Sequence, residues 1–231
     1  VNGVDSPRLW DNATWTTITG ASTPAITGVT TTLLAHVTLF KNRLFFVESS
    51  SMRLWYLPVN SVGGAAAQMD MGSIFRLGGY VMAAYTWTLD AGSGSDDHLV
   101  IISSNGEIAV YRGSDPSSST DWSVIGVFTM GRPLGRRCAV KFGGDLAVNT
   151  YEGVYPLGKG LLSSSVDRRV ALTDKIQNSV SQAASTLGAN FGWQVCLNAD
   201  DNMLILNVPY GGGANYQYAQ NTITGAWTVF S

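Results

Sequence analysis

Charged residues are scarce in this sequence. Only 13% of its 231 residues are Asp, Glu, Lys or Arg, the formal net charge is −2, and basic residues never occur in runs longer than the pairs at 136–137 and 168–169. Binding to nucleic acid or to anionic membranes without sequence preference depends on dense positive charge. We therefore expect that this chain makes no direct contact with nucleic acid and binds no membrane.

Cysteine and long apolar runs are also scarce. The two cysteines, Cys138 and Cys196, lie far apart, each within an apolar stretch. A disulfide framework has more cysteines in a shorter chain, so we interpret both as buried thiols. No apolar run approaches the roughly 20 residues that span a bilayer, and the first residues lack the basic and apolar regions of a signal peptide.

Strand-forming and turn-forming residues dominate instead. The chain has 26 glycines and seven tryptophans, nearly half of its residues are apolar, and much of its polar character comes from Ser, Thr and Asn. Aromatic and β-branched residues favour strands, and glycine permits the tight turns between them. The composition predicts a globular protein built from short strands, long enough to bury a sizeable core.

A unit of three or four strands recurs along the chain at intervals of about 50 residues. Four copies cover residues 36–58, 81–113, 136–158 and 192–231. In each copy, apolar stretches are separated by turn sequences such as Asn105-Gly106. Such repeated meanders are typical of β-propeller blades, in which each small sheet is buried on both faces. We therefore predict an all-β fold and a single β-propeller domain over residues 1–231.

Residues 7–19 resemble the outer half of one further unit. PRLWDN is similar to RLWYLP at 53–58, and ATWTTIT is similar to GAWTVFS at 225–231. In a closed propeller, the other half of such a blade comes from the opposite end of the chain. This predicts about five blades, or six with one incomplete. Because the sequence does not begin with methionine and its last residue ends an apparent strand, we expect a fragment of a larger protein.

One segment, residues 166–187, breaks the strand pattern. Its apolar residues recur at helical spacing: Val170, Ile176, Val180, Ala183 and Ala184. Ser165 or Asp167 is a candidate N-cap, and Gly188 is a stop signal. The pattern predicts one α-helix, inserted between blades. Two roles stay open: the helix covers exposed strand edges, or it docks another subunit, with Ile176 and Val180 as the partner-docking residues.

The acidic residues do not form a catalytic pair. A glycoside hydrolase, the enzyme class best suited to such a scaffold, needs two carboxylates that flank the sugar bond. The three glutamates, Glu48, Glu107 and Glu152, lie beside turns, where a solvated carboxylate is ordinary. The same holds for four aspartates: Asp90, Asp145, Asp200 and Asp201. We therefore predict no catalytic residues and expect that the chain is not an enzyme.

Metal and cofactor ligands are equally sparse. His36 and His98 lie in different repeats, without a second histidine nearby. Asp-Asp-His at 96–98 lies in a loop rich in Gly and Ser that we interpret as solvated, as is the serine-rich segment 114–120. Asp-Asp-Asn at 200–202 supplies too few oxygens for a calcium loop, and no phosphate-binding GxxxxGK[ST] motif is present. We predict no metal site and no cofactor.

Five tryptophans fall at matching strand positions of different repeats: Trp10, Trp15, Trp55, Trp122 and Trp227. Equivalent positions favour a packing role, either between blades or over outer strands. The alternative is a ring of sugar-binding aromatic residues, as in lectin propellers. Lectin propellers carry near-identical repeats, whereas these repeats are divergent.

Several segments together resemble one protein family. They are LFKNRLFFVESSSMRLWYLP at 39–58, YEGVYPLG at 151–158, LTDKIQNSV at 172–180, and NVPY at 207–210 followed by YQYAQNTITGAWTVF at 216–230. With these segments, the chain resembles the β-propeller region of podophage tail hub proteins, which include the tail tubular or nozzle-forming proteins and the related DNA-stabilisation proteins. The resemblance covers most of the chain, but its motifs are structural and specify no catalytic residue.

The resemblance implies a structural component of a bacteriophage tail or neck, forming part of the hub or nozzle through which DNA is ejected. It implies a place in the virion after assembly in the host bacterial cytoplasm. It also implies contacts with other tail or connector proteins and, in the full-length parent protein, a homo-oligomeric ring of about six subunits. Two alternatives stay open, a carbohydrate-binding propeller for host adsorption and a glycoside hydrolase propeller.

Overall fold

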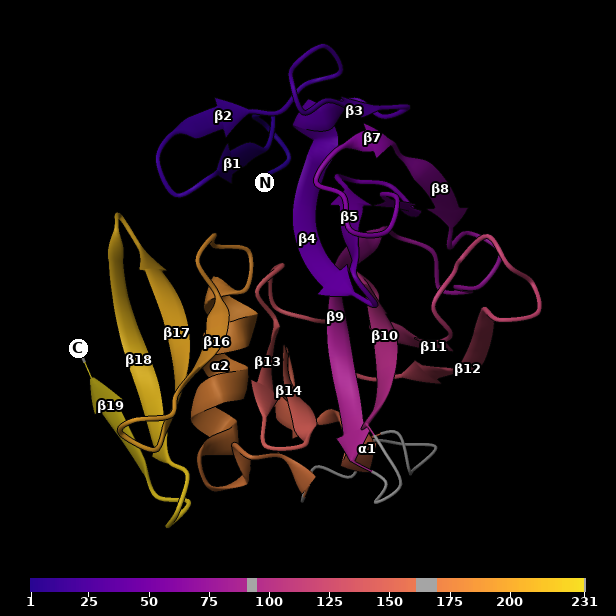
Figure 1. The fold of residues 1–231 in the computed structure, drawn as a ribbon. Helices are drawn as coiled ribbons and strands as arrows, with labels where there is room; N and C mark the ends of the chain where they lie inside the picture. The colour runs from indigo at the N-terminus through magenta and orange to yellow at the C-terminus, as the bar shows by residue number, and fades with distance from the viewer. Residues whose placement is uncertain (91–94, 161–169, 231) are drawn as a thin grey trace. The chain divides into compact units, whose positions relative to one another are not determined.

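The computed structural model describes residues 1–90, 95–160 and 170–230 (Figure 1). Strands account for 48% of the structure and helices for 10%, and the strands form several antiparallel sheets. The predicted all-β fold is confirmed. The chain forms two compact units, residues 1–86 with 96–127 and residues 87–95 with 128–231, and each has its own core.

The first large sheet contains four antiparallel strands in this order: β4 (Leu34–Phe40), β5 (Arg43–Glu48), β6 (Arg53–Tyr56) and β8 (Ala67–Asp70). Its side chains alternate between two apolar clusters. Phe45 and Val47 of β5 enter one cluster, whereas Phe46 between them enters the other. Trp55 of β6 lies on the same side as Phe46. Both faces of β5 and β6 are therefore buried, which explains the nearly continuous apolar sequence of these two strands.

The N-terminal segment covers one of these faces. It contains two small sheets: β1 (Arg8–Trp10) pairs antiparallel with β2 (Trp15–Thr17), and β3 (Ile26–Thr27) pairs parallel with β7 (Gly64–Ala65). A 3₁₀ turn at Thr31–Leu33 leads into β4. Ile18 and Ile26 pack in the cluster that contains Phe46 and Trp55.

Most of the second large sheet belongs to the same unit, and its strand order is β12-β11-β10-β9. Its strands are β9 (Val81–Asp90), β10 (Ser95–Ser103), β11 (Glu107–Arg112) and β12 (Ser123–Thr129). Leu99, Ala109 and Tyr111 from this sheet share one cluster with Phe45 and Val47 from the first sheet. The two sheets thus pack through a common apolar core.

The other unit contains two further antiparallel sheets. The three-stranded sheet consists of β13 (Ala139–Phe142), β14 (Asp145–Thr150) and β15 (Gly153–Pro156); the four-stranded sheet consists of β16 (Gln194–Asn198), β17 (Met203–Gly211), β18 (Ala214–Asn221) and β19 (Trp227–Phe230). A short helix, α1 (Leu157–Gly160), follows β15. Both sheets contribute to one core, with Val154 from the three-stranded sheet and Leu206 from the four-stranded sheet. The four predicted repeats correspond to the four large sheets.

The predicted helix is shorter than residues 166–187. Helix α2 (Gln177–Leu187) ends where predicted but begins later, after a 3₁₀ turn at Asp174–Ile176. Residues 166–169 and the candidate caps Ser165 and Asp167 lie outside the described residues.

The later start has a physical cause in residues 172–173. The N–H of Leu172 donates to the carbonyl of Val154 on β15 at 2.8 Å, and the N–H of Val154 donates to the hydroxyl of Thr173 at 3.1 Å. These bonds hold the segment along β15, and its backbone forms only 3₁₀-type bonds there, from the N–H of Asp174 to the carbonyl of Ala171 and from the N–H of Ile176 to that of Thr173. From residue 177 onward, α2 packs its buried side against β15 and β17.

Candidate functional site

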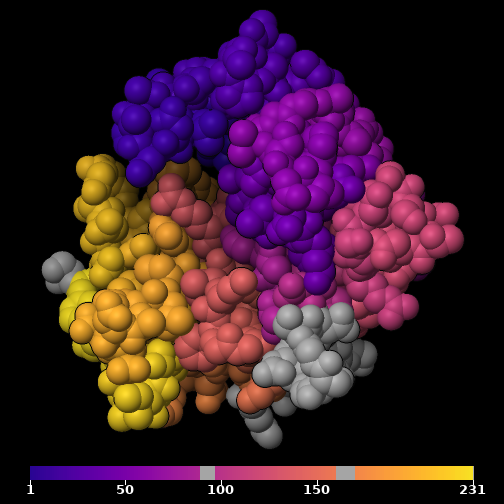
Figure 2. All heavy atoms as spheres, in the orientation of Figure 1, coloured from indigo at the N-terminus to yellow at the C-terminus, as the bar shows by residue number. Residues whose placement is uncertain are grey.

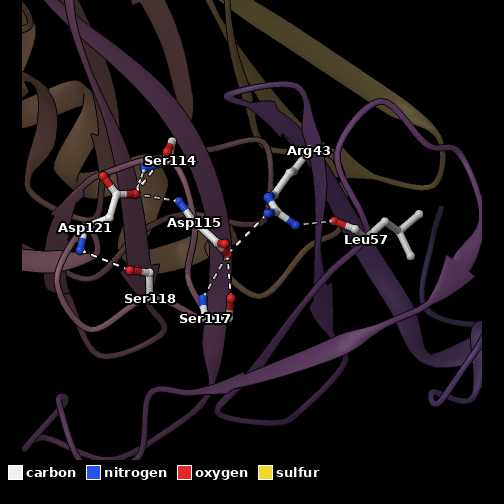
Figure 3. A network of polar contacts seen from close by, with 7 residues as sticks. All are labelled: Arg43, Leu57, Ser114, Asp115, Ser117, Ser118 and Asp121. Atoms are coloured by element: carbon white, nitrogen blue, oxygen red, sulfur yellow. Dashed lines mark hydrogen bonds and ion pairs between the residues drawn. The ribbon is translucent and has the colours of Figure 1, made fainter.

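A polar network organises the loop between β11 and β12 (Figure 3). The carboxylate of Asp121 accepts hydrogen bonds from the N–H and hydroxyl of Ser114, at 2.6 and 3.0 Å, and from the N–H of Asp115 at 2.8 Å. Asp115 accepts from the N–H and hydroxyl of Ser117 at 3.1 and 2.8 Å. Hydrogen bonds from Ser117 lower the pKa of Asp115, and those from Ser114 lower the pKa of Asp121. Both carboxylates therefore favour the ionised form.

Arg43 connects this loop to the first large sheet. Its side chain is only 14% exposed and forms an ion pair with Asp115 at 3.2 Å. The guanidinium also lies over the ring of Tyr56, at 5.8 Å from its centroid, and donates to the carbonyl of Leu57 at 3.4 Å (Figure 3). The charged groups of the network thus bind one another, which is the arrangement of a structural clamp.

None of residues 114–120 is buried, which agrees with the predicted solvated segment, and hydrogen bonds within the loop also order it. Its aspartates hydrogen-bond within the loop, and Trp122 at its end stacks on two rings of the core. The ring centroids of Trp122 and Tyr111 are 5.4 Å apart, and those of Trp122 and Phe45 are 6.2 Å apart. The prediction rested on composition, which does not show that Asp115 and Asp121 have donors two to seven residues away.

Two of the three glutamates are buried, so the prediction of solvated carboxylates is wrong for them. Glu48 is 4% exposed and accepts hydrogen bonds from Arg53 at 2.5 Å and from the indole N–H of Trp55 at 2.7 Å. A buried carboxylate without donors would carry a large desolvation cost. Arg53 and Trp55, both on β6, supply these donors.

Glu107 is also 4% exposed and holds the connection that leads from the first to the second large sheet. Its two carboxylate oxygens accept the backbone N–H groups of Arg76 and Leu77, each at 2.8 Å. In the same connection, Gly79 (φ 91°) approaches Ser104 so closely that a Cβ at residue 79 would lie 2.3 Å from the serine hydroxyl. Glu48 and Glu107 are therefore both engaged by structural partners.

The other acidic residues singled out in the sequence are dispersed. Glu152 and Asp200 are exposed. Asp201 accepts a hydrogen bond from Asn198 at 2.8 Å, and Asp145 accepts one from the backbone N–H of Gly158 in α1 at 2.9 Å. The side chain of Asp90 lies outside the described residues. Among the residues that the structure describes, no two of these carboxylates bind the same hydrogen-bond or ion-pair partner.

The two histidines occupy different surroundings. Nε2 of His36 lies 2.7 Å from the carbonyl of Ala84 and donates to it. Residues 96–98, predicted in a solvated loop, lie in β10 instead, and His98 is only 4% exposed, because the strand begins at Ser95. Asp97 forms an ion pair with Lys41 at 3.4 Å. Across residues 1–90, 95–160 and 170–230, no three His, Cys, Asp or Glu side chains gather closely enough to hold a metal ion. The absence of a metal site stays a prediction for the whole chain.

The predicted docking residues Ile176 and Val180 pack within their own unit. Val180 is fully buried in the core, and Ile176 is half-buried against the same cluster. The exposed side of α2 carries only polar residues: Asn178, Ser179, Gln182, Ser185 and Thr186. The side chain of Val180 thus stabilises the chain's own core, and a partner docking on α2 would meet its polar side.

The tryptophans divide into packed and exposed groups. Trp55 is buried, and the half-buried Trp227 donates its indole N–H to the carbonyl of Leu172 at 3.1 Å. Trp10 and Trp15 differ, since they are 47% and 64% exposed and form a cross-strand pair with ring centroids 5.3 Å apart. A packing role within the described unit therefore does not hold for this pair.

The two cysteines agree with their prediction as core thiols, since Cys138 is buried and Cys196 is half-buried. Among the described residues, the helices are too short or too polar to cross a membrane. Comparison with models of protein families and with curated proteins gives no match.

Proposed function

We propose that this chain is a structural component of a bacteriophage tail or neck, where it forms part of the hub or nozzle through which DNA is ejected. The observation that carries the proposal is the succession of antiparallel meanders, which follow the segments that resemble podophage tail hub proteins. In this proposal the chain lies in the virion and contacts other tail or connector proteins. Its full-length parent forms a ring of about six subunits.

The same proposal includes the finer architecture, a single β-propeller domain of about five blades over residues 1–231. Two observations support it. Adjacent large sheets share one apolar core within each unit, and the inner strands β5 and β6 of the first large sheet are buried on both faces. Both features are typical of blades that stack face to face. The β1–β2 hairpin is the incomplete blade in this scheme.

The hydrogen bonds of the two buried glutamates support a structural role without catalysis. Glu48 and Glu107 accept hydrogen bonds from an arginine, an indole and two backbone N–H groups. A general acid or base must instead reach the substrate. The low charge of the chain likewise favours lasting protein contacts over binding to DNA.

Electron microscopy of phage particles labelled on this domain tests the assembly role. We expect the label at the tail or neck, in a ring. Particles that carry no label while the free chain accumulates in the lysate would reject the proposal. In a gel-shift assay at physiological salt, we expect that the chain does not retard DNA; a salt-sensitive shift would contradict the expected lack of DNA binding.

The exposed tryptophan pair favours carbohydrate binding as a second candidate function. Aromatic faces are common platforms for apolar ligand surfaces, and Arg8 and Thr17 lie on the same face of the hairpin as Trp10 and Trp15. Glycan-array binding that is lost in Trp10→Ala and Trp15→Ala would support this function. Phe191→Ala is the matched control because Phe191 is an aromatic residue that is 92% exposed elsewhere. Equal loss in the control would reject a specific role for the pair.

A further inference from the structure

β12 is the outermost strand of its sheet and pairs only with β11 within the residues that the structure places (Figure 1). Its apolar side chains are exposed on both faces: Val124 is 42%, Ile125 49% and Val127 42% exposed. The segment around it, pink in Figure 2, lies at the surface of the view. β12 therefore presents an open sheet edge lined with apolar side chains.

The described edge strand carries no charged residue and no proline, two of the usual protections against pairing with another strand. Proteins commonly place charged residues, proline or a bulge on edge strands, because the outward N–H and C=O groups can bind a further strand. β12 has the sequence SVIGVFT, which contains neither charge nor proline. Its start is also held rigidly, because Trp122 stacks in the core and Asp121 is bonded to Ser114. A rigid strand loses little conformational freedom on pairing.

The sequence of β12 is nearly symmetric about Gly126. Reading outward from Gly126, residues at equal distance are of one chemical type: Ile125 with Val127, Val124 with Phe128, and Ser123 with Thr129. Residues that lie opposite each other in antiparallel strands point to the same face. Two copies of β12 aligned on Gly126 would therefore match apolar with apolar and hydroxyl with hydroxyl on both faces.

We propose that β12 pairs antiparallel with β12 of a second copy of this chain, across a two-fold axis at Gly126, so that the two sheets join into one. The symmetric sequence favours a second copy over another protein, because the strand is complementary to itself. The absence of charge means that two copies meet without repulsion. This inference goes beyond the proposed function and stands independently of it.

The size of the contact predicts a reversible dimer. Every second residue of each strand offers one N–H and one C=O outward, which gives about six to eight backbone hydrogen bonds for seven residues. A strand of seven residues is only about 24 Å long. Pairing along this length covers less than the roughly 1,200–2,000 Å² of standard stable interfaces. We therefore expect association that depends on protein concentration.

Sedimentation analysis of the 231-residue chain over a concentration series tests the proposal. We expect the average mass to rise from the 24.6 kDa of one chain toward twice that value. In the proposed pairing, residue 125 of one copy faces residue 127 of the other. Ile125→Lys with Val127→Lys therefore places like charges opposite each other twice, and we expect the dimer to be lost. Ile125→Lys with Val127→Glu places opposite charges at the same positions, and we expect the dimer to be retained.

Val229→Lys is the matched control, because Val229 is 56% exposed on β19, another edge strand. We expect it to leave the dimer unchanged. The proposal is overturned if the unaltered chain stays monomeric over the series, if the dimer survives the double lysine variant, or if the lysine–glutamate variant is equally monomeric. Loss of the dimer in Val229→Lys overturns it as well, because the contact then lies on β19.

Hydrogen exchange of the unaltered chain gives a second readout that needs no variant. We expect the amides of 123–129 to exchange more slowly at high than at low protein concentration, because pairing protects the outward N–H groups. Protection that does not change with concentration, in a sample that sedimentation shows to be dimeric, would place the contact elsewhere and overturn the proposal.

Discussion

Replacing Glu107 by glutamine tests whether a buried carboxylate holds the connection between the two large sheets of its unit. The substitution keeps the shape of the side chain but removes one of two acceptors. The amide nitrogen then faces a backbone N–H of Arg76 or Leu77, now 2.8 Å from a carboxylate oxygen. A hydrogen bond to a charged group contributes about 1.5–3 kcal/mol, and a buried donor left without a partner costs about 1–3 kcal/mol. We therefore expect Glu107→Gln to lower the free energy of unfolding by about 2–4 kcal/mol.

Urea unfolding followed by tryptophan fluorescence measures this loss, and hydrogen exchange at Arg76 and Leu77 locates it. Glu152→Gln is the control, because Glu152 is an exposed glutamate in a turn. Exposed substitutions change stability by less than about 0.5 kcal/mol. A Glu107→Gln variant as stable as Glu152→Gln, with unchanged exchange at both amides, would refute the structural role of the carboxylate.

Three further outcomes are expected. Val180→Ala should lower the free energy of unfolding by about 2–3 kcal/mol, because it opens a cavity in the core, whereas the exposed Asn178→Ala should be nearly neutral in the same calorimetric measurement. Burial and the neighbouring Tyr218 raise the pKa of Tyr216 from 10.0 to about 12. An ultraviolet titration should therefore show a late phenol that Tyr216→Phe removes, and the stability from this group should be complete below pH 10 and lost as the pH rises to about 12. Burial also raises the pKa of the Cys196 thiol, so mass spectrometry should detect slower alkylation of Cys196 in the native than in the unfolded chain at mildly alkaline pH; equal rates would contradict this.

The strand meanders could be predicted from sequence because their signals are local. The stretch RLFFVE followed by a serine turn and RLWYLP indicates two strands and their turn without knowledge of the fold, and β5 and β6 lie there. The signal for the end of α2 is equally local, because a glycine follows Leu187.

The partners of the acidic residues could not be predicted because they come from distant positions. Glu107 binds the N–H groups of residues 76 and 77, about 30 residues earlier, and Arg43 forms an ion pair with Asp115 in the loop between β11 and β12. In sequence, each of these acids is a turn residue like any other. The start of α2 was missed for the same reason, since Leu172 and Thr173 are held by β15 and not by their neighbours in sequence.

The burial of both faces of β5 and β6 removes the signal that normally fixes how strands align. A strand with one wet face cannot slip by one residue without exposing its apolar side chains. With Phe45 and Phe46 both buried, a one-residue slip of β5 against its neighbours would exchange one of its apolar side chains for another. Alignment must then depend on geometry at the strand ends: the two-residue turn Lys41-Asn42, in which both residues have positive φ, and the bond of Glu48 to Trp55. Lengthening that turn by one residue should produce a misaligned yet compact sheet.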